Sequence, residues 1–392
     1  MRNKILAMIA LSAVLLTGCT TGANTQPSSA ETQFSTITTD PTETTEQTEI
    51  SVPQKPMLAL SLPVYCEQNK EGDVIIFEHV YQSIDLIVPE SEIGTRVTKD
   101  FLKRINTEDM AQQINEWAVD SYPIFADDWA HYICRVTYEP VRFDAAVLSL
   151  YGSHAYFADM HFTEGANKSV TYDMTTGKTL KLTDILTSFS RDELKKTILD
   201  SLEKQAEGIE LYEDYQNVVS QRFSGSLSQD TDWYLGNDGL YFFFSPYEIA
   251  PRSSGVITVQ IPYSQLAGKM DDAYFPPETE LTNGSIKAAE YTDNVGQQYT
   301  QIANVMLHND EIKTILYSEL SVSDVRLELG AYDSNIFIPQ HTIFATPSLT
   351  PGDAVVLHCD SKDLSTLRIS YKNGDQVHYL YFDTNENLIY NN

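Results

Sequence analysis

The chain is poor in cysteine, with only four in 392 residues. Cys19 stands apart, at the end of an apolar segment. The other three, Cys66, Cys134 and Cys359, are an odd number and cannot all pair within one chain. Their spacing fits no zinc module and includes no Cys-x-x-Cys pair. A bridge between Cys66 and Cys134 is one reading, and small buried free thiols are the reading we favour.

Basic residues are also scarce: 26 Lys and Arg stand against 55 Asp and Glu, a formal charge of −29. A surface this acidic repels nucleic acid and anionic lipid headgroups, which argues against both as partners. It attracts cationic partners instead. Solubility alone is the other reading of the same charge.

No apolar run approaches the ~20 residues of a membrane-spanning helix. The longest such run, residues 5–16, follows Arg2 and Lys4. Its last residue, Leu16, begins the sequence Leu-Thr-Gly that directly precedes Cys19. This pattern predicts a lipoprotein signal peptide over residues 1–18, with a lipid on Cys19 that anchors the protein to the extracytoplasmic face of the cell membrane. An ordinary secretory signal with a chance cysteine is the alternative.

The segment after Cys19 has little to bury. Residues 19–56 are dominated by Thr, Ser, Glu, Gln and Pro, which predicts a disordered tether between the lipid and the folded part. Removing residues 1–18 takes away two basic residues and no acidic one. That leaves 24 basic against 55 acidic residues, a formal charge of −31.

Residues 57–165 read as one helix against an antiparallel sheet, an α+β domain. Long runs rich in β-branched and aromatic residues predict the strands. A helix is expected to begin after Thr107, with Met110, Ile114 and Trp117 at i, i+4 and i+7 on its buried face.

Residues 166–272 read as a second α+β domain. The sequence predicts two strands joined around residues 175–177 and a hairpin turning at residues 237–239. A helix between them is predicted to begin at a capping box and a last strand to follow residue 255. The capping box is Ser190 with Glu193, the buried helix face Leu194, Ile198 and Leu202, and the buried strand face Ile257, Val259 and Ile261.

Residues 273–285 contain a Pro pair and Asn-Gly and are predicted to be a linker. Beyond them, residues 286–392 form short apolar runs separated by turn residues, which predicts an all-β, immunoglobulin-like sandwich. The expected fold class is therefore α+β: two small helix-on-sheet domains followed by a sandwich. We expect few contacts to cross the linker, so that residues 57–272 and 286–392 fold independently.

Several motifs resemble one family in their order and spacing. They are Gly152-Ser153-His154, Asp173 to Lys178 with Leu180, Leu182 and Asp184, Pro246 to Pro251 with Gly255, and Ile261-Pro262-Tyr263. This set resembles the extracytoplasmic domain of RsiV-type anti-sigma factors, a domain also found beside the catalytic module of some cell-wall polysaccharide deacetylases. With its usual small α+β partner, the resemblance covers about residues 57–272.

The resemblance implies binding of host-type lysozyme at the cell surface. The sequence contains no cytoplasmic anti-sigma segment, no membrane-spanning helix and no deacetylase module. Binding is therefore the part of the family's behaviour that we expect here, and signalling through regulated proteolysis is not expected.

The sequence offers little support for catalysis. His154, Asp159 and His161 suggest a zinc site, but His154 is expected on the opposite strand face and no fourth ligand is evident. A structural, hydrogen-bonding role for His154 is the preferred reading. Gly-x-Ser-x-Gly is absent, and the serines near residue 250 have no histidine nearby. We expect no metal, no cofactor and no enzymatic activity.

The remaining feature is "SPYEIAPRSSG", residues 245–255, between two predicted strands. Its prolines stiffen the loop, while Tyr and Arg are the residues that most often anchor interfaces. The candidate ligand-binding residues are Tyr247, Glu248, Pro251 and Arg252. A structural crossover with Tyr247 packed on the sheet edge is the competing reading. The candidate partners are a cationic hydrolase such as lysozyme, then peptidoglycan; an enzyme acting on wall polysaccharide is the alternative from another class.

Overall fold

The computed structural model describes most of the chain from Lys55 onward. The described residues are 55–61, 64–68, 72, 74–126, 129–158, 161–224, 232–278, 284–307, 312–333, 336–382 and 389–391. The predicted signal peptide, Cys19 and nearly all of the predicted tether lie outside them. From Gln54 to Asn392 the chain forms one compact unit. Lys55, which the sequence assigns to the tether, already belongs to this unit, because its Nζ lies 2.8 Å from Oδ2 of Asp353.

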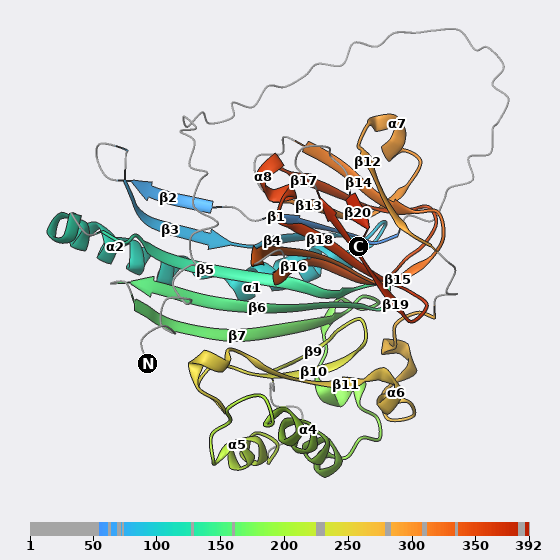
Figure 1. Cartoon of the computed structure of the whole chain (residues 1–392), viewed down its shortest axis with the longest axis horizontal. Helices are drawn as coiled ribbons and strands as arrows, with labels where there is room; N and C mark the ends of the chain where they lie inside the picture. Colours follow the sequence, from blue (N-terminus) through green and yellow to red (C-terminus); the bar gives the residue numbers. More distant parts are fainter. Residues whose placement is uncertain are drawn as a thin grey trace, which may run out of the picture. The chain divides into compact units, whose positions relative to one another are not determined.

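A six-stranded sheet, in the order β2-β3-β5-β6-β7-β8, dominates the first part of the unit (Figure 1). The strands are β2 (Val64–Gln68), β3 (Ile75–Tyr81), β5 (Tyr132–Phe143), β6 (Val147–Ala158), β7 (His161–Asp173) and β8 (Lys178–Thr179). The alternation of buried and partly exposed residues along β5 gives the sheet one apolar face.

Two helices accompany this sheet, α1 (Ile93–Ile105) and α2 (Glu108–Phe125). The predicted helix start is confirmed, since Thr107 immediately precedes α2. Its buried face is partly different from the expected one. Ala111, Ile114 and Ala118 are buried, whereas Trp117 is 47% exposed. Small alanines allow α2 to approach the sheet closely, which places the large Trp117 ring at the margin.

A separate three-stranded sheet, β11-β10-β9, lies between β7 and the helices α4 and α5 (Figure 1). Its strands are β9 (Trp233–Leu235), β10 (Gly239–Phe244) and β11 (Ile257–Pro262), and the helices are α3 (Leu182–Ile185), α4 (Arg191–Gln205), α5 (Tyr215–Arg222) and α6 (Tyr263–Leu266). Short 3-10 turns span Arg252–Ser254 and Asp272–Tyr274.

The local predictions for this region are confirmed. Gly177 has φ of 67° at the turn between β7 and β8, and the 237–239 hairpin joins β9 to β10. The side chain of Ser190 accepts a hydrogen bond from the backbone N–H of Glu193, which confirms one half of the predicted capping box, while the carboxylate of Glu193 forms an ion pair with Lys269. All six residues predicted for the two buried faces are buried: Leu194, Ile198, Leu202, Ile257, Val259 and Ile261.

The C-terminal part is a β-sandwich, as the sequence predicts. Its strands are β12 (Ile286–Glu290), β13 (Thr300–Met306), β14 (Ile312–Ser318), β15 (Val322–Asp333), β16 (Ile336–Leu349), β17 (Asp353–Cys359), β18 (Leu367–Asn373), β19 (Gln376–Phe382) and β20 (Ile389–Asn391), with short helices α7 (Asp293–Gly296) and α8 (Ser361–Leu364). One sheet has the order β16-β15-β18-β19-β20. The fold class, α+β with a C-terminal sandwich, is confirmed.

The second sheet of the sandwich differs from the expectation. Its order is β12-β14-β17-β13-β1-β4, so it takes in β1 (Met57–Ser61) and β4 (Ser83–Ile87) from the start of the folded chain. β1 lies parallel to β13, and β13 lies parallel to β17. Immunoglobulin sheets are antiparallel, so these parallel pairs set this sandwich apart from them.

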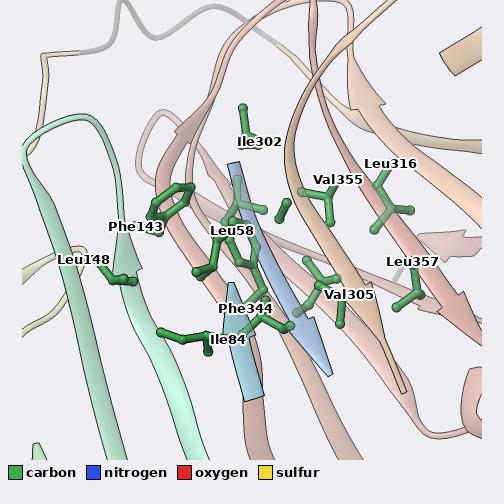
Figure 2. Close-up of a cluster of buried hydrophobic side chains, with 14 of the residues drawn as sticks. Leu58, Ile84, Phe143, Leu148, Ile302, Val305, Leu316, Phe344, Val355 and Leu357 are labelled. Atoms are coloured by element: carbon green, nitrogen blue, oxygen red, sulfur yellow. The ribbon is translucent and has the colours of Figure 1, made fainter. Parts of the chain in front are cut away.

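A single hydrophobic core crosses the predicted domain boundaries. Figure 2 shows Leu58 and Ile84 beside Val305, Val355 and Phe344. The sequence-based division assigns the first two residues to one domain and the last three to another, whereas all five belong to one cluster. The helical region has its own core, built from α3, α4 and the inner face of β9 to β11.

Candidate functional site

The loop after β10 is an ordered turn with its own hydrogen bonds. The backbone N–H of Tyr247 donates to the carbonyl of Ala250 (3.1 Å), and that of Glu248 donates to Ser245 (3.0 Å). The carbonyl of Ile249 accepts from the N–H of Tyr212, just before α5. Ile249 and Ala250 are buried. The loop is therefore anchored at its centre, and the side chain before that anchor points outward.

Tyr247 is that outward side chain. The residue is 62% exposed, and its backbone has φ of 70°. Left-handed backbone is unfavourable for a residue with a bulky side chain, at a cost of roughly 1–3 kcal/mol. The surrounding hydrogen bonds hold Tyr247 in this conformation and at the same time present its ring to solvent. The competing reading, in which Tyr247 packs on the sheet edge, does not match this exposure.

Arg222, the last residue of α5, stabilises the loop through hydrogen bonds from its guanidinium. Its Nη1 donates to the carbonyl of Phe243 (2.9 Å) and to Oε1 of Glu248 (3.1 Å). Its Nη2 donates to Oδ2 of Asp232 (2.6 Å), and its Cζ lies 4.7 Å from the centre of the Phe244 ring. The guanidinium thus ties α5, β10 and the loop together.

Glu248 faces inward in this arrangement. Besides accepting from Arg222, it accepts through Oε2 from the backbone N–H of Ser245 (2.9 Å). Both carboxylate oxygens are therefore engaged within the loop. Of the four candidate residues, Glu248 is the one that the structure places in a supporting position.

Pro251 and Arg252 form the second half of the loop. Pro251 is partly buried and precedes the 3-10 turn that begins with Arg252. The turn ends where the N–H of Gly255 donates to the carbonyl of Arg252, with Gly255 at φ of 66°. The side chain of Arg252 is exposed. Tyr247 and Arg252 are thus exposed on one loop, from two consecutive turns.

Sequence reasoning missed Arg222 and Asp232. Neither lies in a recognisable motif, and Arg222 comes from a helix more than twenty residues before the loop. The available signal was weak: a basic residue in the last turn of a short helix, which ordinarily indicates only a favourable interaction with the helix dipole.

His154 has the structural role that the sequence suggests. It lies in β6, nearly buried, with Nε2 3.0 Å from Oη of Tyr138. Burial lowers the pKa of His154 to about 4, with a smaller contribution from Lys168. Asp159 lies outside the described residues, as does the side chain of His161. Among the side chains that are described, no group of three or more His, Cys, Asp or Glu could hold a metal ion.

Two of the cysteines are buried and form no disulfide. They are Cys134 and Cys359, and burial raises the pKa of the Cys134 thiol to about 11. A thiol with so high a pKa is a poor nucleophile at neutral pH. The preference for free thiols is confirmed at these two positions, while the side chain of Cys66 lies outside the described ones.

None of the helices in the described ranges is long and apolar enough to cross a bilayer. The fold is that of an α+β protein with a braced, tyrosine-bearing loop and a C-terminal sandwich. Residues 183–264, which include this loop, match the family described as "Protein of unknown function (DUF3298)". A DUF3298 domain is therefore present in this chain.

Two solved structures of DUF3298 proteins are similar to the chain. One, from Bacteroides fragilis, is 14% identical with a TM-score of 0.42, covering 56% of this chain and 96% of its own. The other, from Pseudomonas aeruginosa, is 15% identical with a TM-score of 0.38, covering 58% of this chain and 99% of its own. No curated protein matches the chain.

Proposed function

We propose that this protein is a binding protein, lipid-anchored through Cys19 on the extracytoplasmic face of the cell membrane. Its DUF3298 domain presents the 245–255 loop to a cationic cell-wall hydrolase such as lysozyme. It acts by binding and catalyses no reaction of its own.

The observation that carries this proposal is the conformation of Tyr247. A bulky residue that is 62% exposed is held in left-handed backbone by a turn with hydrogen bonds from Tyr247 to Ala250 and from Glu248 to Ser245. Glycine would remove the strain at this position. Retaining a strained tyrosine where glycine would fit is typical of a position at which the ring itself is needed.

The charge of the protein favours a cationic partner. The full chain carries a formal charge of −29, and −31 without residues 1–18. Such a field speeds the encounter with a basic protein and slows the encounter with anionic surfaces. Lysozyme-like hydrolases have the required positive charge.

The motif set adds a second line of support. The loop residues Pro246 to Pro251 and Gly255 resemble those of RsiV-type anti-sigma factors, and the same loop lies within the DUF3298 match. For that family the resemblance implies lysozyme binding. The relation to RsiV and to the deacetylases remains part of this proposal.

Mixing the unit Gln54–Asn392 with lysozyme, and separately with purified peptidoglycan, tests the proposal. We expect saturable binding to lysozyme, with no release of reducing sugar or acetate from peptidoglycan. Tyr247→Ala should weaken the binding of lysozyme, and Tyr332→Ala, which changes an exposed tyrosine of the sandwich, should leave the binding of lysozyme unchanged. Release of sugar or acetate that scales with protein concentration would make the protein an enzyme and overturn the proposal.

A further inference from the structure

The outer face of the β16-β15-β18-β19-β20 sheet carries a cluster of aromatic side chains. Ring centres are 5.5 Å apart between Tyr332 and Phe337, 5.8 Å between Phe337 and Tyr381, and 6.5 Å between Tyr381 and Tyr379. Tyr379 and Tyr381 alternate along β19 with the core residue Leu380, so they lie on the face away from the core. We call these four residues the aromatic face.

An ion pair is set into the aromatic face. Cζ of Arg368 lies 4.7 Å from the ring centre of Phe337 and 4.8 Å from that of Tyr379. Its Nε and Nη2 each lie 2.9 Å from Oε2 of Glu328, which also accepts from Oγ of Ser370. Glu328 is only 9% exposed. The guanidinium is therefore held between two rings, with donors and a carboxylate at fixed positions.

The aromatic face borders water. Tyr332 is 51% exposed, and Tyr379 and Tyr381 are partly exposed. Val377 lies two residues before Tyr379 on β19, on the same face of the strand, and is 46% exposed. Large side chains exposed together on one sheet face exceed the scattered exposure that a folded surface normally shows, and such gatherings mark interaction sites.

The residue types select the ligand. A pyranose ring has a face of slightly positive C–H groups that suits the negative face of an aromatic ring, and an edge of hydroxyls that both donate and accept. The aromatic face offers rings bearing hydroxyls beside an arginine and a carboxylate. Anionic lipids and nucleic acids would meet a repulsive field. A neutral sugar chain avoids this cost.

We propose that the aromatic face is a binding site for a neutral, hexopyranose-based glycan. Tyr332, Tyr379 and Tyr381 stack on sugar rings, while the largely buried Arg368–Glu328 pair holds the rings of Phe337 and Tyr379 in position. The site belongs to the C-terminal sandwich and shares no residue with the Tyr247 loop. It gives a surface-anchored protein a contact with polysaccharide in addition to any contact that the loop makes.

Isothermal titration calorimetry of the unit Gln54–Asn392 with two neutral tetrasaccharides, of β-1,4-linked N-acetylglucosamine and of β-1,4-linked glucose, tests this site. We expect at least one to bind saturably. Tyr379→Ala and Tyr332→Ala should each weaken that binding roughly tenfold or more, as expected for anchor residues. Tyr379→Phe keeps the ring and should retain most of the affinity.

Two control variants show whether the glycan binds at the aromatic face or at another tyrosine-rich surface. Tyr299→Ala changes one member of a tyrosine pair with Tyr317, 4.8 Å apart, on the other sheet of the sandwich, and should leave glycan binding unchanged. Tyr247→Gly should also leave it unchanged, so failure of the loop proposal does not affect this result. No binding of either tetrasaccharide at millimolar concentration would overturn the assignment. Partition of the unit onto phosphatidylcholine vesicles, abolished by Tyr332→Ala, would also overturn it and would make this a lipid-facing surface.

Discussion

Leu58 of β1 lies opposite Ala303 of β13 in a parallel strand pair that joins the start of the folded chain to the C-terminal sandwich. Leu58 is fully buried in the core shared with the sandwich. The pairing makes residues 54–285 and 286–392 parts of one folding unit.

The first prediction follows from this pairing. Leu58→Ala should lower the free energy of unfolding by about 2–5 kcal/mol, because it opens a cavity in the shared core. Urea denaturation should show one transition when followed by circular dichroism and by tryptophan fluorescence. Ala59→Ser, on the neighbouring and partly exposed position of β1, is the matched control. A fragment ending at residue 285 that unfolds as cooperatively as the whole unit would contradict the account.

The second prediction concerns the hydrogen bonds between Arg222 and the loop. Arg222→Met keeps much of the side-chain volume but removes the guanidinium that donates to Glu248 and Asp232. We expect a loss of about 2–3 kcal/mol in unfolding free energy and faster proteolysis within residues 245–255. Arg252→Met, at an exposed arginine of the same loop, should change stability little. Equal losses in the two variants would show that Arg222 has no special role.

A third prediction is a pH dependence from His154. Its pKa is about 4 in the folded protein because of burial, below the ordinary value of about 6.5. The folded state therefore favours neutral His154. The contribution of neutral His154 to the free energy of unfolding is complete above about pH 6.5 and is lost as pH falls towards about 4.

Urea denaturation from pH 7 to pH 4 measures this effect. His154→Gln should be less stable than the parent at pH 7, and the difference between the two should shrink towards pH 4. His341→Gln, at an exposed histidine beside Glu139, controls for a general effect of losing an imidazole. A difference between parent and His154→Gln that stays constant with pH would contradict the assignment.

The fourth prediction tests the anchor. Cys19→Ala should abolish labelling with a fatty-acid probe and leave the precursor uncleaved, since the predicted lipobox ends at this thiol. Labelling followed by gel electrophoresis measures both effects. If the variant still partitions into detergent as a lipidated species, Cys19 is not the anchor.

Local features of the fold were predictable because their causes are local. The cap at Ser190, the turn at Gly177 and the buried face of α4 depend on neighbouring residues, and all three form as expected. The partner of β1 was not predictable. Alternating hydrophobicity indicates that a segment is a strand with one buried face, but it carries no information on which distant strand lies beside it.

At the candidate site, too, the sequence predicts local features but not contacts between distant segments. The composition of residues 245–255 pointed to a rigid loop, and Tyr247 and Arg252 are exposed on it. The inward position of Glu248 depends on Arg222, which reaches the loop only through the tertiary packing of α5. The strain at Tyr247 was equally hidden, because a left-handed backbone is expected for glycine or asparagine rather than tyrosine.

The central claim is that the ring of Tyr247 is kept for binding at a cost in stability. The most direct measurement is the dissociation rate of lysozyme from Tyr247→Gly by surface plasmon resonance, together with the unfolding free energy of the same variant. We predict dissociation faster by roughly tenfold or more, equivalent to about 1.4 kcal/mol, and a protein as stable as the parent or more stable by up to ~1 kcal/mol. A variant that is more stable and dissociates at the parent rate, or a parent that does not bind lysozyme, would contradict the account.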